Sequence, residues 1–478
     1  MFKKILVANR SEIAIRVFRA ARELRIPSVG IYSAEDRLTL HRFNTRESYR
    51  IGEGKGPIEA YLDMDGIIRI AKQSGADAIH PGYGFLSENP DFARLCSESG
   101  ITFIGPSPEI MRRLGNKVEA RALAIKADVP VMPATEPLPH DGAEITRLAE
   151  SIGYPLMLKA SWGGGGRGMR VIEDESGLLD RVAAARREAQ AAFGNDEVYL
   201  EKLVGNARHV EVQIMGDSHG QVVHLFERDC TVQRRHQKIV ERAPAPYLSE
   251  QQRDDITSAA VRLAQSVQYC NAGTVEFLQD VDTGQFYFIE VNPRIQVEHT
   301  VTEQITGLDL VKSQIRIAAG ASIGDVDSSG IPAQEKISMR GAAIQCRVTT
   351  EDPRNSFIPD YGHIVAYRSP AGPGIRLDAG TAYSGAVIGR HYDSLLVKIT
   401  ASGVSEAEAT DRMLRGLSEF RVRGVETHLA FLRALLTDAL FINGDFNTRF
   451  VDVSPELLEL TADEGHGAQL VYFIGDVI

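Results

Sequence analysis

The sequence has little cysteine and no long apolar run. Its four cysteines are far apart and form no CxxC pair, so neither a zinc site nor a disulfide framework is predicted. We interpret them as small buried apolar residues: Cys96, Cys230, Cys270 and Cys346. No apolar stretch approaches the roughly 20 residues that a membrane-spanning helix needs. We therefore expect no membrane segment.

Positive charge is also scarce. The chain carries 53 Lys and Arg against 64 Asp and Glu, for a formal net charge of −11 at pH 7. This balance argues against general nucleic-acid binding, so basic residues have to be interpreted locally. No GxGxxG follows the first predicted strand, which argues against a dinucleotide cofactor. That strand begins at Lys4 and leaves no room for a signal or transit peptide, so a cytoplasmic location is expected.

The first 115 residues alternate short apolar strands with helices. We predict strands at residues 4–8, 28–32, 77–80 and 102–104, and helices near residues 12–24, 64–74 and 90–99. Such alternation predicts a parallel doubly wound sheet, which binds ligands at the carboxyl ends of its strands. The polar, glycine-containing loop at residues 80–89 is either part of such a site or a tight turn.

A glycine-rich segment occupies the centre of the next module, at residues 131–203. Five of the six residues 163–168 are glycine, between predicted strands at residues 156–160 and 169–172. Without side chains, such a loop lets backbone N–H groups close over phosphates, so we predict a mobile lid on a nucleotide. A flexible linker is the alternative.

An antiparallel sheet is predicted beyond the lid. Its strands are expected at residues 198–201, 209–215, 222–227, 273–280 and 286–292, with a helix at 250–268. The last two strands form a hairpin that carries Glu276 and Glu290. Residues 341–450 mix strands with amphipathic helices at 405–420 and 427–437. The chain ends in an apolar, strand-like segment at 469–478, which we interpret as a cut through a longer polypeptide.

The most informative segment is 287–299, where an apolar strand ends in alternating carboxylate, amide and guanidinium groups. Glu276, Glu290 and Asn292 offer oxygen ligands for one or two Mg²⁺ ions that bridge phosphates, and Arg294 offers an anion site beside them. The alternative is a salt-bridge ladder on the surface. The unusual string favours the phosphate site.

Further polar residues suggest a nucleotide and an acceptor. Lysines at 117, 159 and 202 can neutralise phosphate charge, and Glu201 with the main chain after it can accept from an adenine amino group. The mixed-charge run at 227–238 is either a basic surface loop or part of the site. In the second case Lys238 and Arg294 hold a small anionic acceptor, with Glu298 as its general base.

Several longer strings resemble one family, the ATP-grasp biotin carboxylases, from Lys4 to about Leu460. They include KILVANRSEIAIR, HPGYGFLSEN, KASWGGGGRGMRV, ERDCTVQRRHQK and FIEVNPRIQVEHTVTE. The strings ERAPAPYL and QCRVTTEDP look more like the pyruvate carboxylase branch than like the separate subunits of acyl-CoA carboxylases.

The resemblance implies an ATP-grasp fold of the α/β class, α+β overall. Residues 1–115 would form an N-terminal doubly wound parallel-sheet domain, and 116–330 the ATP-grasp domain with its mobile glycine-rich lid at about 132–203. Residues 331–455 would form a C-terminal domain with a mixed or antiparallel sheet, and 456–478 the start of a following linker or domain.

The activity implied by the resemblance is ATP-dependent carboxylation of biotin by bicarbonate through carboxyphosphate. This would be the first half-reaction of pyruvate carboxylase, which makes oxaloacetate; the alternative is a biotin carboxylase subunit of acetyl-CoA or propionyl-CoA carboxylase. ATP and Mg²⁺ or Mn²⁺ are the implied cofactors. The ATP positions are Lys117, Lys159, Gly164, Gly165, Gly166, Gly168, Met169, Glu201, Lys202, His209, Gln233, His236, Glu276 and Glu290.

The same resemblance assigns the remaining site residues. The metal would be held by Glu276, Glu290 and Asn292. Bicarbonate would be held by Lys238, Arg294, Gln296, the main chain of Val297, and Glu298, which would take its proton. Arg347 would stabilise the biotin enolate, with Tyr83 and Asp393 near the biotin pocket. The implied catalytic residues are thus Lys238, Arg294, Glu298 and Arg347.

No lysine in the sequence is flanked by methionines on both sides, the context in which the family carries biotin. Biotin would therefore be presented by a carrier domain, and the carboxyl group used by a carboxyltransferase domain, in the same longer chain or in separate subunits. A homo-oligomer is expected for the full enzyme. A silent nucleotide-sensing domain is one competing hypothesis, and the complete set of metal and anion residues argues against it. A nucleic-acid binder based on residues 233–238 is the other; it leaves the glycine-rich segment unexplained and needs a phosphate-binding surface on an acidic chain.

Overall fold

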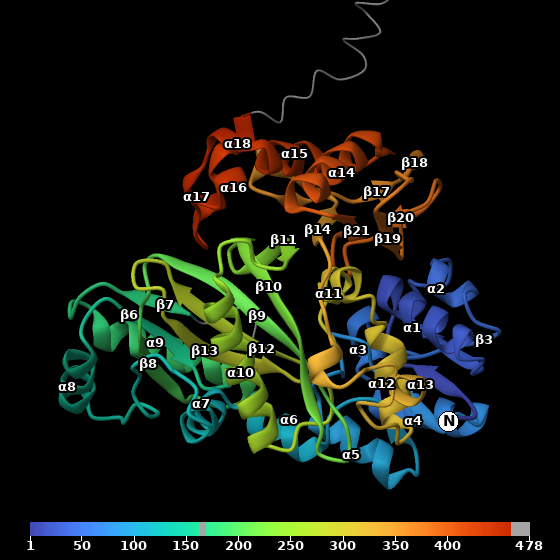
Figure 1. The fold of residues 1–478 in the computed structure, drawn as a ribbon. Helices are drawn as coiled ribbons and strands as arrows, with labels where there is room; N and C mark the ends of the chain where they lie inside the picture. Colours follow the sequence, from blue (N-terminus) through green and yellow to red (C-terminus); the bar gives the residue numbers. More distant parts are fainter. Residues whose placement is uncertain (163–168, 460–478) are drawn as a thin grey trace, which may run out of the picture.

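The computed structural model describes residues 1–162 and 169–459 (Figure 1). The predicted lid residues Gly164, Gly165, Gly166 and Gly168, and the strand-like ending at 469–478, lie outside the described residues. Of the helices in the described ranges, none has the length and hydropathy needed to cross a membrane.

The N-terminal region contains a five-stranded parallel sheet with strand order β3-β2-β1-β4-β5. Its strands are β1 (Ile5–Val7), β2 (Ser28–Tyr32), β3 (Glu47–Arg50), β4 (Ala78–His80) and β5 (Thr102–Phe103). The helices are α1 (Ser11–Glu23), α2 (Leu40–Phe43), α3 (Pro57–Tyr61), α4 (Met64–Ser74), α5 (Pro90–Glu98), α6 (Pro108–Gly115) and α7 (Lys117–Lys126). The predicted parallel sheet is confirmed. The polar edge strand β3 gave no apolar signal and was not predicted.

A small module with a three-stranded antiparallel sheet, order β7-β6-β8, follows. It consists of α8 (Gly142–Ile152), β6 (Leu156–Ala160), β7 (Arg170–Ile172), α9 (Leu178–Phe193) and β8 (Val198–Lys202). The predicted pairing of the strands that flank the glycine segment is confirmed, with Leu156 opposite Ile172. Both side chains are fully buried in the core of the module.

The largest sheet is antiparallel and has eight strands, in the order β13-β12-β9-β10-β11-β14-β21-β19. From the central region come β9 (Ala207–Gly216), β10 (Val222–Arg234), β11 (Gln237–Ala243), β12 (Asn271–Asp280) and β13 (Phe286–Asn292). The C-terminal region supplies β14 (Ala342–Thr349), β19 (Ile375–Ala379) and β21 (Leu395–Gly403). Since β11 pairs with β14, one sheet runs through both regions (Figure 1).

Helices cover this sheet and join it to the N-terminal region. They are α10 (Glu250–Ser266), α11 (His299–Thr306), α12 (Leu310–Ala318) and α13 (Val326–Ser329), with a 3₁₀ turn at Gln334–Lys336. Residues 323–336 are identified from the resemblance as a surface loop, which is only partly right. Ile323 and Ile331 are buried in the core that α12 shares with α1, because both are large and apolar.

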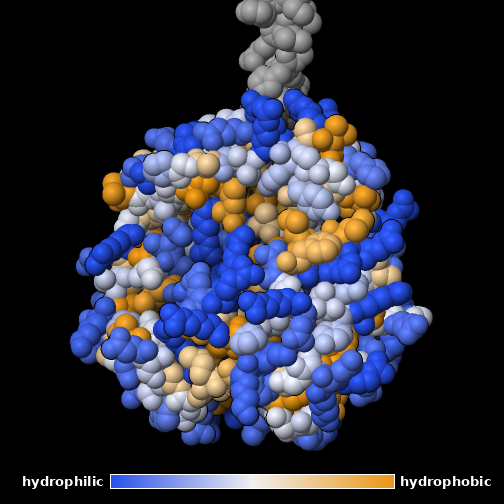
Figure 2. Space-filling view, turned by 90° about the vertical axis from the view of Figure 1, so that its right-hand side faces the viewer, coloured by the Kyte–Doolittle hydropathy of each residue, from blue (hydrophilic) through white to orange (hydrophobic). Residues whose placement is uncertain are grey.

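The C-terminal region completes the fold with small antiparallel pairs and helices packed on β14 and β21. The strands are β15 (Glu351–Asp352), β16 (Ile358–Pro359), β17 (Gly362–His363), β18 (Ala366–Arg368), β20 (Val387–Ile388) and β22 (Arg421–Arg423). The helices are α14 (Glu406–Glu419), α15 (Leu429–Thr437), α16 (Ala439–Asn443), α17 (Phe450–Val453) and α18 (Glu456–Glu459), with a 3₁₀ turn at Pro353–Asn355. The face in Figure 2 is mainly hydrophilic, with hydrophobic groups gathered in its upper half.

Candidate active site

A row of charged residues crosses four neighbouring strands of the large sheet. Arg228 on β10 lies opposite Glu211 on β9, which lies opposite Glu276 on β12, which lies opposite Glu290 on β13. Arg228 and Glu211 are fully buried, and Arg228 Nε donates to Glu211 Oε1 at 2.5 Å. Buried charges are stable only when paired in this way.

Strand alternation explains how β9 presents this row. His209, Glu211 and Gln213 occupy one face of the strand, because successive side chains point to opposite faces. The intervening Val210 and Val212 are buried in the core beneath α10. The segment HVEVQ therefore carries a signal that the predictions did not use: polar residues at every second position of an otherwise apolar strand.

A β-bulge shapes the edge of the row. Glu276 pairs with Glu290 and Phe277 with Phe288, so Ile289 is an extra residue in β13. A bulge bends its strand and redirects the side chains beyond it, and bulges are common next to active sites. Here the residues after the bulge are Glu290 and Asn292, two of the three predicted metal ligands.

Lys238, on β11, is the centre of the site. Its ammonium donates to Glu211 Oε2 at 2.5 Å, Glu276 Oε1 at 2.8 Å and Glu298 Oε1 at 2.8 Å. Burial opposes the charged form of this amine, but Glu211, Glu276 and Glu298 outweigh it and hold the pKa of Lys238 well above its ordinary value. Lys238 is therefore a fixed cation among three carboxylates.

Glu298 and Arg347 lie on the other side of Lys238. Arg347 Nη2 is 3.2 Å from Glu298 Oε2 and 2.6 Å from Glu241 Oε1, so the guanidinium lies between two fully buried carboxylates. Burial favours the neutral form of Glu298, but Lys238 and Arg347 outweigh it and lower its pKa below the ordinary range. Glu298 is thus ionised, as a base must be, and its cations keep it a weak base.

The predicted anion loop, residues 293–298, connects β13 to α11. Arg294 Nη1 donates to Gln296 Oε1 at 2.8 Å and Nη2 to Asn292 Oδ1 at 3.1 Å. The amides of Asn292 and Gln296 in turn donate to Glu276 Oε1 at 2.8 and 3.2 Å. The structure therefore joins two of the predicted metal residues, Glu276 and Asn292, with the anion residues Arg294, Gln296, Lys238 and Glu298 in one hydrogen-bonded network.

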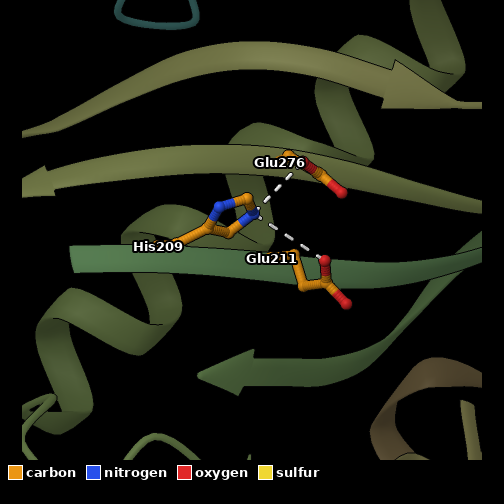
Figure 3. Close-up of side chains that lie close together, drawn as sticks. All are labelled: His209, Glu211 and Glu276. Carbon is orange, nitrogen blue, oxygen red and sulfur yellow. Dashed lines mark ion pairs between the residues drawn. The ribbon is translucent and has the colours of Figure 1, made fainter. Parts of the chain in front are cut away.

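The carboxylates beside Lys238 form a cluster of possible metal ligands. Figure 3 shows His209 Nε2 pointing at Glu276 and Glu211, 3.1 Å from Glu276 Oε2 and 3.9 Å from Glu211 Oε2. Glu290 lies opposite Glu276 and contacts Lys117 Nζ at 3.2 Å. The free lone pairs of Glu276 and Glu290 face lysine and histidine side chains that can move aside, so these two carboxylates fit a hard divalent cation such as Mg²⁺.

The other predicted nucleotide residues lie around this centre. Lys159 on β6 forms an ion pair with Glu201 on β8. Lys202 donates to the carbonyls of Gly153 and Tyr154, at 3.0 and 2.9 Å, so its amine holds main chain within its own module. Met169 is half-buried just before β7. These roles stay predictions.

Gln233 and His236 belong to the hairpin of β10 and β11. The predicted mixed-charge loop at 227–238 is thus two paired strands, with only Arg235 and His236 in the turn. Gln233 is buried near the end of β10, and His236 is exposed in the turn. The hairpin places Lys238 at the start of β11, where it faces the carboxylate row.

A cavity of about 650 Å³ opens beside Lys238, between the N-terminal region, the β10–β11 hairpin and the C-terminal region. Its walls include the three residues that the resemblance assigns to biotin, Tyr83, Arg347 and Asp393, together with Lys238 and Val297. The volume suits a small organic molecule.

Some buried charged residues in the site were not predicted: Glu211, Arg228, Glu241, Lys398 and Glu12. Glu211 and Glu241 contact predicted residues and Lys398 contacts the main chain of Val297, whereas Arg228 and Glu12 hold two of these residues, Glu211 and Lys398. Glu241, for example, holds Arg347 from 106 positions away. Two of them lay within sequence patterns that could have revealed them: Glu211 in the alternating segment HVEVQ and Arg228 in the mixed-charge run at 227–238.

Three family models match the chain in succession. "Biotin carboxylase, N-terminal domain" matches residues 1–111, "Carbamoyl-phosphate synthase L chain, ATP binding domain" residues 116–326, and "Biotin carboxylase C-terminal domain" residues 345–453. The pyruvate carboxylase of Staphylococcus aureus is 52% identical over 99% of this chain, and the mitochondrial human enzyme 52% over 100%. The chain spans only 41% and 40% of these two relatives.

Solved structures show the same relationship. A pyruvate carboxylase from Rhizobium etli, crystallised with acetyl coenzyme A, has a TM-score of 0.92 and 62% identity, covering 96% of this chain and 41% of that one. The biotin carboxylase domain of 2-oxoglutarate carboxylase from Hydrogenobacter thermophilus, solved with MgADP and bicarbonate, has a TM-score of 0.91 and 44% identity, covering 96% and 99%. With nearly complete coverage on both sides, this chain belongs to the biotin carboxylase family.

Proposed function

We propose that the chain catalyses the ATP- and Mg²⁺-dependent carboxylation of biotin by bicarbonate, through carboxyphosphate. The observation that carries the proposal is the position of Lys238. Its ammonium contacts Glu276 in the carboxylate row and Glu298 at the end of the anion loop. One side chain therefore joins a site suited to metal and phosphate to a site suited to a small anion.

Glu276, Glu290 and Asn292 are the residues proposed to hold the metal. When bound, Mg²⁺ would neutralise charge on the β- and γ-phosphates of ATP. Lys117 and Lys159 would add positive charge on the phosphate side. The H. thermophilus structure, which contains MgADP, supports the binding of a magnesium–nucleotide complex by this chain.

Bicarbonate is proposed to bind between Lys238, Arg294, Gln296 and the main chain of Val297. Glu298 takes its proton, an oxygen of the resulting anion attacks the γ-phosphorus, and the bond to the β–γ bridging oxygen breaks to release ADP. The anion draws Lys238 toward itself, which weakens the hold of this ammonium on Glu298 and strengthens Glu298 as a base.

Biotin is proposed to bind in the 650 Å³ cavity beside Arg347, Tyr83 and Asp393. The ureido N–H gives its proton to the phosphate that leaves carboxyphosphate, the nitrogen takes the carboxyl carbon, and the bond between that carbon and the phosphate oxygen breaks. The guanidinium of Arg347 balances the negative charge that develops on the ureido oxygen, which is the role of a preorganised cation in a water-poor site.

The curated relatives favour pyruvate carboxylase as the parent enzyme over a subunit of acetyl-CoA or propionyl-CoA carboxylase. We propose a carrier domain and a carboxyltransferase domain as partners and a homo-oligomer as the assembly. We propose the cytoplasm as its location, although mitochondrial relatives exist. The gene sequence beyond residue 478 tests the parentage: a carboxyltransferase region there supports pyruvate carboxylase, and an early stop codon contradicts it.

The domain boundaries are also proposed, at 1–115, 116–330 with a lid at about 132–203, and 331–455. The spans matched by the three family models, 1–111, 116–326 and 345–453, support these boundaries.

The central experiment measures ADP release with and without bicarbonate and free biotin. Wild-type protein should need bicarbonate for turnover, and Glu298→Gln should lose at least about 100-fold, the contribution of a positioned general base. Glu227→Gln is the matched control: it removes the same charge from another fully buried carboxylate, which in the described part of the chain accepts hydrogen bonds from Arg253 and a backbone N–H. Bicarbonate-dependent turnover that survives in Glu298→Gln would disprove the proposed base.

A further inference from the structure

The backbone N–H of Val297 lies in the anion loop beside the cavity. Val297 lines that cavity, and its N–H donates no hydrogen bond to any of the residues that the structure describes. In the proposed function this N–H is a donor to bicarbonate. Since a main-chain donor has no rotatable side chain, its direction depends entirely on how the two neighbouring peptide groups are held.

His299 holds the peptide group on the N-terminal side of Val297. Its ring nitrogen Nδ1 is 2.7 Å from the carbonyl oxygen of Gln296, and its backbone N donates to the same oxygen at 3.3 Å. A carbonyl oxygen only accepts, so Nδ1 carries the hydrogen. Burial, with Lys398 as the next cause, holds the pKa of His299 well below its ordinary value, which keeps the ring neutral.

Peptide planarity converts this contact into a direction. The carbonyl of Gln296 and the N–H of Val297 belong to one planar trans peptide group, and in such a group they point in opposite directions. A side chain that fixes the carbonyl therefore also fixes the N–H. Because His299 contacts the carbonyl of Gln296, the N–H of Val297 points away from His299.

Lys398 holds the next peptide group. Its ammonium, on β21 and fully buried, donates to the carbonyl oxygen of Val297 at 2.9 Å. This peptide group joins Val297 to Glu298, so its position also determines the position of Glu298, the proposed base. Glu12 on α1 lies behind the lysine, with Oε1 3.3 Å from Nζ. The anion loop is thus tied to the N-terminal region and to β21 in the C-terminal region.

We propose that His299 and Lys398 are positioning residues for bicarbonate, and that Glu12 supports Lys398. They fix two successive peptide groups, so that the N–H of Val297 faces the anion and Glu298 stands beside it. Burying a lysine and a histidine costs desolvation free energy, which apolar residues of similar volume would not cost. Packing alone therefore does not account for these two residues. The inference rests on the proposed function and adds residues to it.

Two substitutions of His299 separate positioning from packing. In His299→Asn the amide nitrogen can take the place of Nδ1, whereas in His299→Gln it lies nearer the place of Nε2. We expect His299→Gln to lower kcat/KM for bicarbonate by about 10- to 100-fold, because a displacement of about 1 Å costs this much. His299→Asn should recover most of this loss, and KM for ATP should change less than about twofold in both.

Variants of Lys398 separate the hydrogen bond from the charge. Lys398→Met removes both and leaves Glu12 unpaired, whereas Glu12→Gln with Lys398→Met removes the unpaired charge as well. If the main role is to hold Val297, the double variant regains stability but still loses about tenfold or more in kcat/KM for bicarbonate. Lys312→Met is the matched control. Like Lys398, Lys312 pairs with a glutamate of α1, in this case Glu23, but it lies on α12 and does not contact the anion loop.

Each result decides a different point. Wild-type kcat/KM for bicarbonate in His299→Gln and Lys398→Met, or equal losses for bicarbonate and ATP, would overturn the inference, because the residues would then be merely structural. MgADP binding measured by calorimetry on each variant shows that the protein is folded. Wild-type protein that released ADP without need of bicarbonate would instead overturn the proposed function, and the inference with it.

Discussion

Arg347 is held between two buried carboxylates, Glu241 and Glu298. The two have different surroundings: Glu298 also contacts Lys238, whereas Glu241 accepts from the amide of Gln345 at 2.8 Å. We therefore expect Glu241 to orient the guanidinium, while Glu298, whose ionised form Lys238 and Arg347 stabilise, keeps its proposed role as the base. For each of these two carboxylates, the partner other than Arg347 distinguishes its role.

Glu241→Gln should weaken the hold on Arg347 without removing it. We expect kcat/KM for free biotin to fall about tenfold, as for the loss of one charge-assisted hydrogen bond. Carboxylation kinetics with biotin as the varied substrate measure this. Glu406→Gln, which removes a carboxylate from Arg242 outside the site, should leave the value unchanged. An equal fall in both variants would contradict the orienting role.

Glu12 should make stability depend on pH. Burial is the main cause that raises the pKa of this carboxyl from 4.5 to about 7. Between these pH values the folded protein binds more protons than the unfolded chain. The contribution of Glu12 to the free energy of unfolding is therefore fully present below about pH 4.5 and is lost as the pH rises to about 7. The loss is about 3 kcal/mol. Urea unfolding at a series of pH values should show a smaller decline in Glu12→Gln, and parallel curves would refute the assignment.

Sequence reasoning located the residues whose neighbours in the chain share their chemistry. The string from Glu290 to Glu298 was found because carboxylate, amide and guanidinium groups follow one another there. Lys398 was missed because it is the only charged residue of β21, and Glu241 because its neighbours in β11 do not indicate its role; the partner of each lies about 100 or more residues away. Such contacts arise only when β11, β14 and β21 pair.

At the scale of elements, the β10–β11 hairpin is unusual in its turn. Arg235 and His236 have φ of 48° and 65°, so both occupy the left-handed region in a two-residue turn. Asparagine and glycine are the ordinary residues there, because a side chain costs roughly 1–2 kcal/mol in this conformation. Strain retained at a site often reflects function.

Glycine at either turn position should relieve the strain. We expect Arg235→Gly and His236→Gly each to stabilise the protein by about 1 kcal/mol in urea unfolding. Only His236→Gly should raise KM for ATP, because His236 is the proposed nucleotide residue of the two. A rise in both variants would indicate that the turn conformation, and not the imidazole, serves the nucleotide.

The helices and hairpins were predictable where the apolar period was clear. The strands at 28–32 and 286–292 and the helix at 64–74 were placed at their observed bounds. The continuation of β10 to Arg234 was not, since charged residues from 227 onward do not look like a strand. Their charges are buried among partners that the sequence alone does not reveal.

At the scale of the whole molecule, the large sheet unites regions that the sequence separates. Strand β11 pairs with β14, and Val240 lies opposite Cys346 in a core that contains both regions. The boundary proposed near residue 330 therefore falls between two strands of one sheet. The order of regions was predictable from composition and motifs, but this pairing was not.

Separate production of residues 1–330 and 331–459 tests how far the regions fold alone. Each fragment would expose a long unpaired strand, β11 or β14, and such edges associate with other chains. We expect aggregation of each fragment in size-exclusion chromatography and light scattering, and a soluble complex when they are produced together. Two soluble, separately folded fragments would show that the sheet is divisible and would favour two independent domains.

The contacts of Lys238 have a consequence for the timing of catalysis. An ammonium has three N–H donors, and here each is engaged by a carboxylate. Substrate anions can then enter only by exchanging partners with the resident carboxylates, and an arriving cation releases Glu276 in the same exchange. Before substrates bind, the charge of the Lys238 ammonium is thus balanced by carboxylates of the protein itself. The site would become competent for reaction only when its substrates have bound, which leaves little opportunity for water to hydrolyse ATP beforehand.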